Sequence, residues 1–453
     1  MFPQIPNPQH AGSDCNNFKP KPKGNHWAPS ADDPTYYTRR GWAFGTIEDV
    51  FNCQKHGEHT MFLGANISAA RPIVSKSLLE HARNSWVSLR AADAQAWAER
   101  TLLLHEEKVK TLDDLRYELG EKLLPDANGD QTFLHLVVHS DTSFGVLLHT
   151  SHVPFDGTSA KIITTRFLKT LALLLDVGSP ADLNLKWGDE HANMTPAAGR
   201  VLGPNEVVEG AGYGETLNSV MMGFATVMMR GHGFKWRLGL SLSVDETAKF
   251  VEFAKSNGFT VNQVVHAALM MVCVFDNPPT ADTPTDAALV SMSLVNPRYR
   301  LQSAYSGRDG YPELALCGSA ILTEIAHAIK AEYLKQKAFP SLLAITQQQT
   351  EMMLPALKNA GPDAPPFMGP AYVGDGRGED HLDRAYPGAD GNAVLNLDEF
   401  LLSLNKTEPG GSFRAFSWRD QLVLSVDYNE RTVDREVVQG WMDKWAELLR
   451  VVL

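Results

Sequence analysis

Strand-forming and helix-forming segments alternate along both halves of this chain, and that alternation limits the folds it can adopt. In the first half, two runs rich in β-forming residues, 132–140 and 143–151, are separated by a polar bend, which predicts a hairpin or two adjacent strands. A helical pattern follows at 158–176, with Thr158 or Ser159 as the expected cap. Because alternating strands and helices pack as helix-covered sheets, the pattern predicts an α/β protein.

The second half repeats this pattern. The expected strands are 237–244, 288–296 and two within 413–429, and the expected helices are 245–258, 261–275, 321–336 and 434–453. The chain has 453 residues, more than one hydrophobic core usually organises. We therefore expect two related lobes.

Segments without periodicity suggest the boundaries of these lobes. Residues 1–35 are rich in proline, asparagine, lysine and aspartate, which predicts an extended arm on the surface. We assign 1–195 to an N-terminal lobe that includes this arm, 196–235 to a crossover segment and 236–453 to a C-terminal lobe. The glycine- and proline-rich stretch 358–393 is expected to form a surface loop.

Composition narrows the class of protein. The formal net charge of −12 argues against nucleic acid as a partner, because phosphate binding needs a basic surface. The four cysteines are scattered without a CxxC pair, which is typical of reduced thiols in a cytosolic protein. The N-terminus lacks an apolar signal segment, and the most apolar long run, 261–275, is too short to cross a bilayer. We expect a soluble, cytoplasmic protein without a membrane span.

Several common catalytic signatures are missing. GAGYGE (210–215) and GDGRGE (374–379) fall short of the dinucleotide fingerprint GxGxxG and are expected to be flexible loops. The sequence contains no P-loop and no GxSxG nucleophile elbow. His56, Glu58 and His59 could be offered to a metal ion, but no further cluster has ligand spacing, so we expect no metal site.

The stretch SHVPFDG (151–157) is the strongest candidate for chemistry. A histidine at the end of a buried strand projects into any cavity beyond the sheet edge, and an imidazole suits the role of general base near neutral pH. His152 has this position, and Asp156 stands at the helix start, where a carboxylate accepts backbone N–H groups and stabilises the bend. The alternative is a satisfied core histidine and a simple helix cap, and the local pattern favours neither.

Read as H-x-x-x-D-G, residues 152–157 resemble the signature of the CoA-dependent acyltransferase superfamily. That superfamily includes chloramphenicol acetyltransferase, the BAHD plant acyltransferases, fungal trichothecene O-acetyltransferases and the condensation domains of peptide synthetases. Further stretches resemble it in the expected order, and these are 259–272, 293–301, 315–322 and 412–438. The resemblance implies two chloramphenicol-acetyltransferase-like lobes, each a mixed sheet with flanking helices, and an active-site tunnel between them.

Departures from the family patterns point to one branch. Condensation domains usually carry a second histidine directly before the motif, where this chain has Ser151, which favours a stand-alone enzyme that uses CoA. The DFGWG motif of BAHD enzymes is absent, and YVGDGRG (372–378) does not match it. The chain is therefore most similar in style to the trichothecene O-acetyltransferases.

The resemblance also implies roles for individual residues. His152 would be the general base, and Asp156 would point away from the substrate and pair with Arg298, with Asn296 nearby and Gly157 in the tight turn. His149 is expected to pack or form hydrogen bonds nearby. Ser403 and Asn405 are candidate oxyanion donors, with ordinary strand-end polar residues as the alternative.

The implied reaction is O-acylation, most simply O-acetylation, of a small and largely apolar secondary-metabolite alcohol by acyl-CoA, without a metal, in a monomeric protein. An acceptor pocket or ordinary core packing would explain the apolar residues of the crossover equally well, and these are Met221, Met222, Phe224, Met228 and Met229. Two alternatives keep the fold: a cyclase or pericyclase that uses His152 without CoA, and a non-catalytic binding protein.

Overall fold

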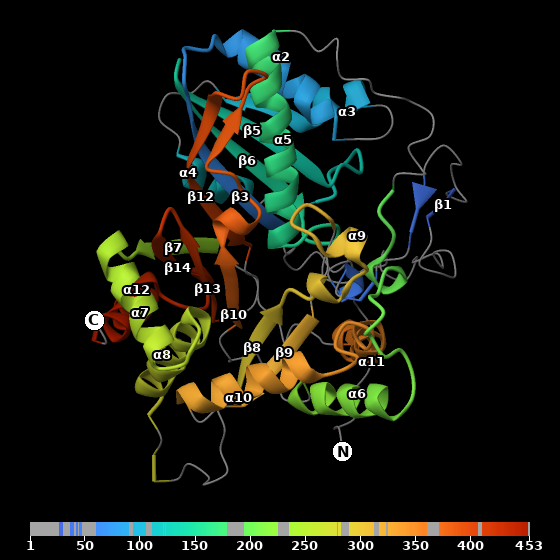
Figure 1. The fold of residues 1–453 in the computed structure, drawn as a ribbon, viewed down its shortest axis with the longest axis vertical. Coiled ribbons are helices and arrows are strands. Elements are labelled where there is room, and N and C mark those ends of the chain that lie inside the picture. The colour runs from blue at the N-terminus through green and yellow to red at the C-terminus, as the bar shows by residue number, and fades with distance from the viewer. Residues whose placement is uncertain are drawn as a thin grey trace.

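The computed structural model describes most of the chain between residues 27 and 451. The described ranges are 27–29, 37–39, 42–43, 45–47, 60–89, 94–105, 111–120, 122, 124–178, 194–224, 235–278, 280–281, 290–311, 317–322, 325–359, 371–405 and 410–451. Two six-stranded sheets dominate these ranges, and each carries helices, as Figure 1 shows. A two-stranded pairing of β1 (Ala28–Pro29) with β2 (Tyr37–Thr38) stands apart from both sheets.

The first sheet has the strand order β11-β12-β3-β6-β5-β4. Its strands are β3 (Thr60–Ala69), β4 (Leu102–His105), β5 (Thr132–Ser140), β6 (Ser143–Ser151), β11 (Ala385–Pro387) and β12 (Ala393–Leu404). Neighbouring strands are antiparallel except β4 and β5, which run parallel. The β5–β6 hairpin expected from the sequence is confirmed.

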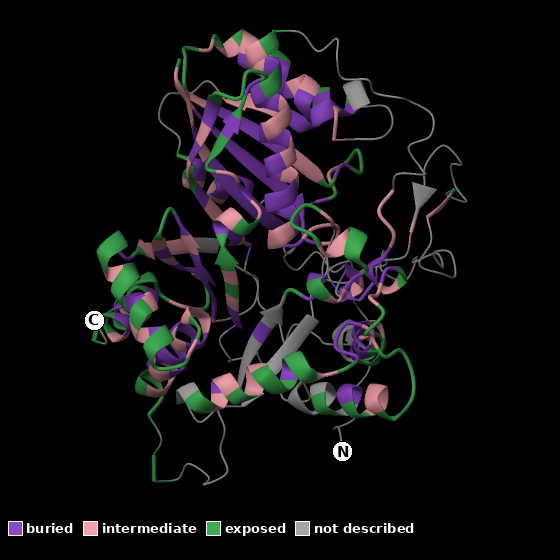
Figure 2. Ribbon diagram, viewed as in Figure 1, coloured by how far each residue is buried: buried purple, intermediate pink, exposed green. Residues whose placement is uncertain are grey.

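Helices cover both faces of this sheet. The longest is α5 (Gly157–Val177), which packs with α2 (Ser75–Val87) over the main core of the lobe, where Trp86 and Phe167 meet edge to face. Also present are α3 (Ala94–Thr101) and α4 (Leu112–Leu119). α4 places its leucines on the opposite face, against strands β3, β5 and β6, so the sheet is buried on both sides (Figure 2).

The second sheet has the order β7-β14-β13-β10-β8-β9. Its strands are β7 (Lys235–Ser241), β8 (Val290–Val295), β9 (Cys317–Leu322), β10 (Ala371–Arg377), β13 (Gly411–Trp418) and β14 (Gln421–Asn429). The helices of this half are α6 (Ala211–Phe224), α7 (Val244–Ser256), α8 (Val261–Asp276), α9 (Ser303–Ser306), α10 (Ile325–Ala338), α11 (Thr346–Asn359) and α12 (Arg435–Val451). α7, α8 and α12 share a core with β7, β13 and β14.

The two sheets are not separate in sequence. β11 and β12 come from the C-terminal half of the chain, yet β12 pairs with β3 along most of its length, from Leu395 opposite Ala69 to Leu404 opposite Met61. The segment assigned from the sequence to the C-terminal lobe, 236–453, therefore completes the sheet of the N-terminal lobe. The two lobes therefore cannot be separated by a single boundary in the sequence, because β11 and β12 belong to the first sheet.

Two segments expected to be irregular contain regular structure. The stretch 358–393 was expected to be a surface loop, but its described part holds β10, β11 and a short 3-10 turn at Gly378–Asp380. GDGRGE (374–379) is thus no flexible loop. A Cβ on Gly374 would lie 1.8 Å from Asn262 Oδ1, so close packing requires the glycine there. Likewise, the expected crossover 196–235 contains α6.

No single helix in the described ranges is long and apolar enough to cross a membrane. α7 and α8 reach that length and composition only as a pair, and they are bent by 98° at their junction.

A substitution at Gly64 tests how closely β12 packs beside β3 within the first sheet. Gly64 faces Leu401 in the β3–β12 register, and a Cβ there would lie 2.9 Å from Leu401 Cγ. We expect Gly64→Ala to lower the free energy of unfolding by about 1–3 kcal/mol through overpacking. Gly214→Ala is the matched control, because no atom lies within 4 Å of its added Cβ. Denaturant titration of both variants measures the difference, and equal stabilities would contradict this view of the packing.

Candidate active site

His152 lies in the turn between β6 and α5. β6 is an inner strand of the first sheet, and the His152 side chain is buried at 8% exposure. Its Nδ1 lies 2.6 Å from the carbonyl oxygen of Phe155. Because a carbonyl oxygen only accepts, Nδ1 carries the hydrogen and donates it, which leaves Nε2 as the basic nitrogen of the neutral ring. The turn thus selects the tautomer that a base acting through Nε2 requires.

Asp156 caps α5. Its Oδ1 accepts hydrogen bonds from the backbone N–H and the hydroxyl of Ser159, both at 2.8 Å. The expectation that Thr158 or Ser159 caps this helix is therefore wrong by two to three residues, because the carboxylate of Asp156 already satisfies the backbone donor of the first turn.

Arg298 joins the second lobe to this cap. It follows β8, and its Nη2 donates to Asp156 Oδ1 at 2.8 Å and to the Ser159 hydroxyl at 2.9 Å. The expected Asp156–Arg298 ion pair is thus present, and both side chains are almost fully buried. Asn296 accepts from Arg298 Nη1 at 3.1 Å and donates to the Thr158 hydroxyl at 3.2 Å. Three hydrogen bonds from Arg298 and Asn296 therefore hold the start of α5 to the second lobe.

Nε of Arg298 is also used. It donates to the carbonyl of Tyr311 at 3.1 Å, and Tyr311 in turn donates its hydroxyl to the carbonyl of Pro196. A guanidinium that donates from Nε, Nη1 and Nη2 keeps one orientation, because any rotation would leave buried donors without these acceptors. The ion pair is therefore a geometric restraint between the lobes.

Ser403 and Asn405 lie at the end of β12, and both are buried. The Ser403 hydroxyl donates to Asp427 Oδ1 at 2.6 Å, and Asn405 Nδ2 donates to the carbonyl of Gly120 at 2.7 Å. Their hydrogen-bond donors thus have protein partners. The oxyanion role assigned to them from the sequence stays a prediction.

His149 packs in the sheet, as expected. Its ring stacks on Phe62 with 4.9 Å between the centroids, and burial lowers the pKa of His149 to about 3. At neutral pH this imidazole is uncharged, and it belongs to the apolar face that α4 covers.

A cluster of charged residues beside the motif was missed from the sequence. Lys161 of α5 lies against Asp375 of β10, which also accepts a hydrogen bond from Arg414 of β13. Asp375 belongs to the stretch interpreted as a loop, and Lys161 lies in an otherwise apolar helix, so their contact depends on a pairing more than 200 residues apart. Charge within an apolar helix was the one available signal.

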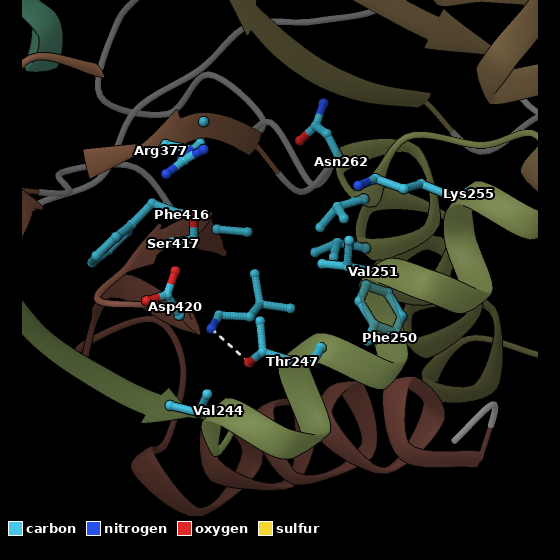
Figure 3. Close-up of a pocket in the computed structure, with 16 residues that line it drawn as sticks. Val244, Thr247, Phe250, Val251, Lys255, Asn262, Arg377, Phe416, Ser417 and Asp420 are labelled. Atoms are coloured by element: carbon cyan, nitrogen blue, oxygen red, sulfur yellow. Dashed lines mark hydrogen bonds between the residues drawn. The ribbon is translucent and has the colours of Figure 1, made fainter. Parts of the chain in front are cut away.

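A cavity of about 600 Å³ opens in the second lobe between α7, α8 and the ends of β10, β13 and β14. Its lining is mostly apolar, and the residues are Val244, Thr247, Ala248, Phe250, Val251, Lys255, Val261, Asn262, Val265, Gly376, Arg377, Ala415, Phe416, Ser417, Asp420 and Leu422. Figure 3 shows Lys255 and Arg377 on opposite sides of this space. None of the motif residues 152–157 lines it.

Two groups of candidate residues cannot be placed. The HGEH stretch at 56–59, Met228 and Met229 lie outside the described residues, and the side chains of Met221, Met222 and Phe224 are likewise not described. Within the described ranges, no three His, Cys, Asp or Glu side chains are grouped so as to hold a metal ion.

Comparisons with known sequences point to acetyltransferases. A family model described as 15-O-acetyltransferase Tri3 matches residues 130–339. The chain is 22% identical to the trichothecene O-acetyltransferase TRI3 of Trichoderma arundinaceum, over 92% of this chain and 95% of that protein. It is 21% identical to the trichothecene 15-O-acetyltransferase TRI3 of Fusarium sporotrichioides, over 72% of this chain and 68% of that one.

Solved structures show the same fold. The TRI3 trichothecene 15-O-acetyltransferase from Fusarium sporotrichioides superposes with a TM-score of 0.81 at 16% identity, over 94% of this chain and 97% of that one. A mutant starter condensation domain of rhizomide synthetase, in complex with C8-CoA, has a TM-score of 0.59 at 12% identity, over 91% and 94% of the two chains. The two-lobed α/β fold class is confirmed, and so is the similarity to trichothecene O-acetyltransferases.

The buried ion pair gives a stability prediction. Asp156→Asn keeps an oxygen for the cap but leaves the Arg298 charge buried without a counter-ion, so we expect it to lower the free energy of unfolding by about 3 kcal/mol. Adding Arg298→Met should restore part of this loss. Arg308→Met is the control, because Arg308 pairs with Asp383 at 41% exposure, where a loss of less than about 1 kcal/mol is expected. Chemical denaturation distinguishes these outcomes, and equal losses at the two pairs would contradict the assignment.

Proposed function

We propose that this chain, which is similar to trichothecene O-acetyltransferases over most of its length, transfers an acetyl group from acetyl-CoA to a hydroxyl group of a small, largely apolar secondary metabolite. One observation carries the proposal. His152 stands at the strand–helix turn with Nδ1 held by the Phe155 carbonyl, so that Nε2 is free to accept a proton.

The reaction needs no nucleophile from the protein. Nε2 of His152 takes the proton of the acceptor hydroxyl, and the oxygen attacks the thioester carbonyl. The tetrahedral oxyanion then collapses, the carbon–sulfur bond breaks, and the proton on Nε2 passes to the departing CoA thiolate. The ring returns to its starting tautomer, because Nδ1 keeps its hydrogen bond to Phe155 throughout.

Asp156 and Arg298 support this reaction indirectly. The carboxylate of Asp156 is satisfied by Ser159 and Arg298, so it serves as the fixed point for the turn that carries His152. Gly157 also helps to fix this turn, because it allows close packing against Leu402: a Cβ on Gly157 would lie 2.7 Å from Leu402 Cδ2. Preorganisation of this kind lowers the barrier by removing misaligned geometries.

Oxyanion stabilisation needs a hydrogen-bond donor, and Ser403 and Asn405 are the two candidates. Ser403 would have to exchange its hydrogen bond to Asp427 for one to the oxyanion, whereas Asn405 could keep its bond to Gly120. Asn405 is the better candidate, because an amide nitrogen has two hydrogens and only one is used at Gly120.

The cavity of the second lobe is the proposed site for part of the acyl-CoA donor. Lys255 and Arg377 supply two cations at a largely apolar cavity, in a chain with a formal net charge of −12. CoA carries phosphates at one end and a flexible chain at the other, which matches exposed cations beside apolar walls. Asp420 at the same rim pairs with Arg384, which limits its repulsion of an anion.

The proposed compartment is the cytoplasm, and the proposed working form is the monomer. The scattered cysteines favour a reducing environment. Cys273, which lies in α8, has its pKa raised to about 12 by burial and by Asp276, so this thiol stays protonated and unreactive.

Replacement of His152 tests the base assignment. We expect His152→Ala to lower kcat about 10²- to 10⁴-fold, because proton transfer in the transition state is lost. The measurement is release of free CoA from acetyl-CoA with a panel of polycyclic alcohols. His139→Ala is the control, since His139 is an exposed histidine on the neighbouring strand β5. Unchanged transfer in His152→Ala would refute the assignment. No CoA release by the wild type with any acceptor would favour a cyclase or a binding protein.

Charge reversal at the cavity tests the donor site. We expect Lys255→Glu and Arg377→Glu each to raise the KM for acetyl-CoA about tenfold, with kcat nearly unchanged, because the lost interaction is made equally in the ground and transition states. The effect should shrink at high salt, since exposed charges are screened. Lys444→Glu, on α12 away from the cavity lining, is the control. An unchanged KM would place the donor elsewhere.

A further inference from the structure

Three charged side chains are buried together between the lobes, beside the first turns of α5. Lys161, Asp375 and Arg414 have side-chain exposures of 1%, 9% and 9%. Asp375 Oδ2 accepts a hydrogen bond from Arg414 Nη1 at 2.6 Å, and Asp375 Oδ1 lies 4.0 Å from Lys161 Nζ. Two cations therefore share one carboxylate in a place that excludes water.

This cluster lies directly against the motif. A Cβ on Gly157 would stand 3.6 Å from Asp375 Oδ1 and 3.8 Å from Arg414 Nη1. Lys161 comes four residues after Gly157, which places it above that glycine on the same helix face. The second lobe thus reaches the start of α5 at two points, through Arg298 at Asp156 and through the Asp375–Arg414 pair at Gly157.

The same two strands form a wall of the cavity. Arg414 is followed by Ala415 on β13, and Asp375 is followed by Gly376 on β10, and both following residues line the cavity. Because the cluster residue and the lining residue are direct neighbours on each strand, a shift of either strand moves the cavity wall and the charged cluster together. The cluster is the physical link between the candidate donor cavity and the turn that carries His152.

The charges of Lys161, Asp375 and Arg414 favour one arrangement of the strands and α5. Burial lowers the pKa of Lys161, and the charge of Asp375 opposes that shift. Burial would raise the pKa of Asp375, but Arg414 and Lys161 hold it below its ordinary value. Buried charges are tolerated only in close pairs. Separation of the strands from α5 would take Lys161 away from Asp375 while the Asp375–Arg414 pair stayed intact, so the buried charge of Lys161 favours one spacing of cavity and helix.

We propose that Lys161, Asp375 and Arg414 form a positioning unit that sets the distance between the acyl donor in the cavity and Nε2 of His152. The proposal rests on the function proposed above and deepens it. The three residues act through Gly157 and the backbones of β10 and β13, and they are not assigned a contact with either substrate.

Kinetics of three variants test the unit. Asp375→Asn leaves two buried cations facing each other, and we expect kcat to fall about 10- to 100-fold, since small misplacements of reacting groups have effects of this size. The KM for acetyl-CoA should stay within about twofold, because the exposed cations of the cavity are untouched. Lys161→Met keeps the Asp375–Arg414 pair, so its kcat should fall less than that of Asp375→Asn. The double variant should be more active than Asp375→Asn alone, because one of the two facing cations is gone.

A second readout does not depend on activity. Amide hydrogen exchange in residues 152–161 should quicken in Asp375→Asn and in Lys161→Met, while exchange in α12 stays as in the wild type. Lys169→Met is the matched control on the same helix, since Lys169 pairs with Asp383 at 44% exposure, and it should change neither kcat nor exchange.

The outcomes separate the two proposals. A wild type that transfers no acetyl group to any acceptor refutes the proposed function, and the exchange measurement still decides whether the cluster holds the turn. If the loss of kcat in the double variant equals the product of the losses in Asp375→Asn and Lys161→Met, the two residues act independently and the proposal of a positioning unit is overturned. If Asp375→Asn does not fold, Lys161→Met carries the test, and equal behaviour of Lys161→Met and Lys169→Met overturns the proposal.

Discussion

The carboxylate of Asp156 both starts α5 and receives Arg298 from the other lobe, and much of the site's geometry depends on these two roles. A buried carboxylate is stable only when all its strong partners are in place. The start of α5 and the contact with the second lobe therefore depend on the same carboxylate, at the end of the turn between β6 and α5. The tautomer of His152 follows, because its partner is the carbonyl of Phe155, the residue immediately before Asp156.

Charge burial between the lobes is a recurring feature of the structure. Ser403 and the backbone N–H of Leu404, both on β12, donate to Asp427 on β14, so a third buried carboxylate joins the strand inserted in the first sheet to the second sheet. Each of these contacts adds little net stability compared with an apolar contact of the same volume. What they add is a defined orientation, because hydrogen bonds to carboxylates weaken steeply when their angles depart from the preferred ones. The transfer reaction proposed for this chain depends on that orientation more than on added stability.

The sequence predicted those elements that depend mainly on the residues within them. The β5–β6 hairpin, α8 and the amphipathic α12 follow from residue periodicity, and the motif at 152–157 was recognised with its Arg298 partner through a family resemblance. β10 was missed because its glycines are typical of a loop, whereas in the fold Gly374 leaves room for Asn262 against the strand. The charge of Lys161 within an apolar helix was a signal, but its counter-ion could not be identified from the sequence, since Asp375 lies 214 positions further along the chain. The pairing of β12 with β3 of the other lobe could not be predicted from the sequence either, because tertiary packing decides which strands pair.

The insertion of β12 beside β3 has a consequence for biosynthesis. A ribosome makes β3, β5 and β6 long before residue 393 is synthesised, so the nascent first lobe carries the β3 edge without its neighbour for more than 240 residues of elongation. An unpaired inner strand of apolar composition is a site for wrong pairing with other chains. Between the emergence of β6 and that of β12 the β3 edge is thus open to strands of other chains, and no contact of the finished fold records that exposure.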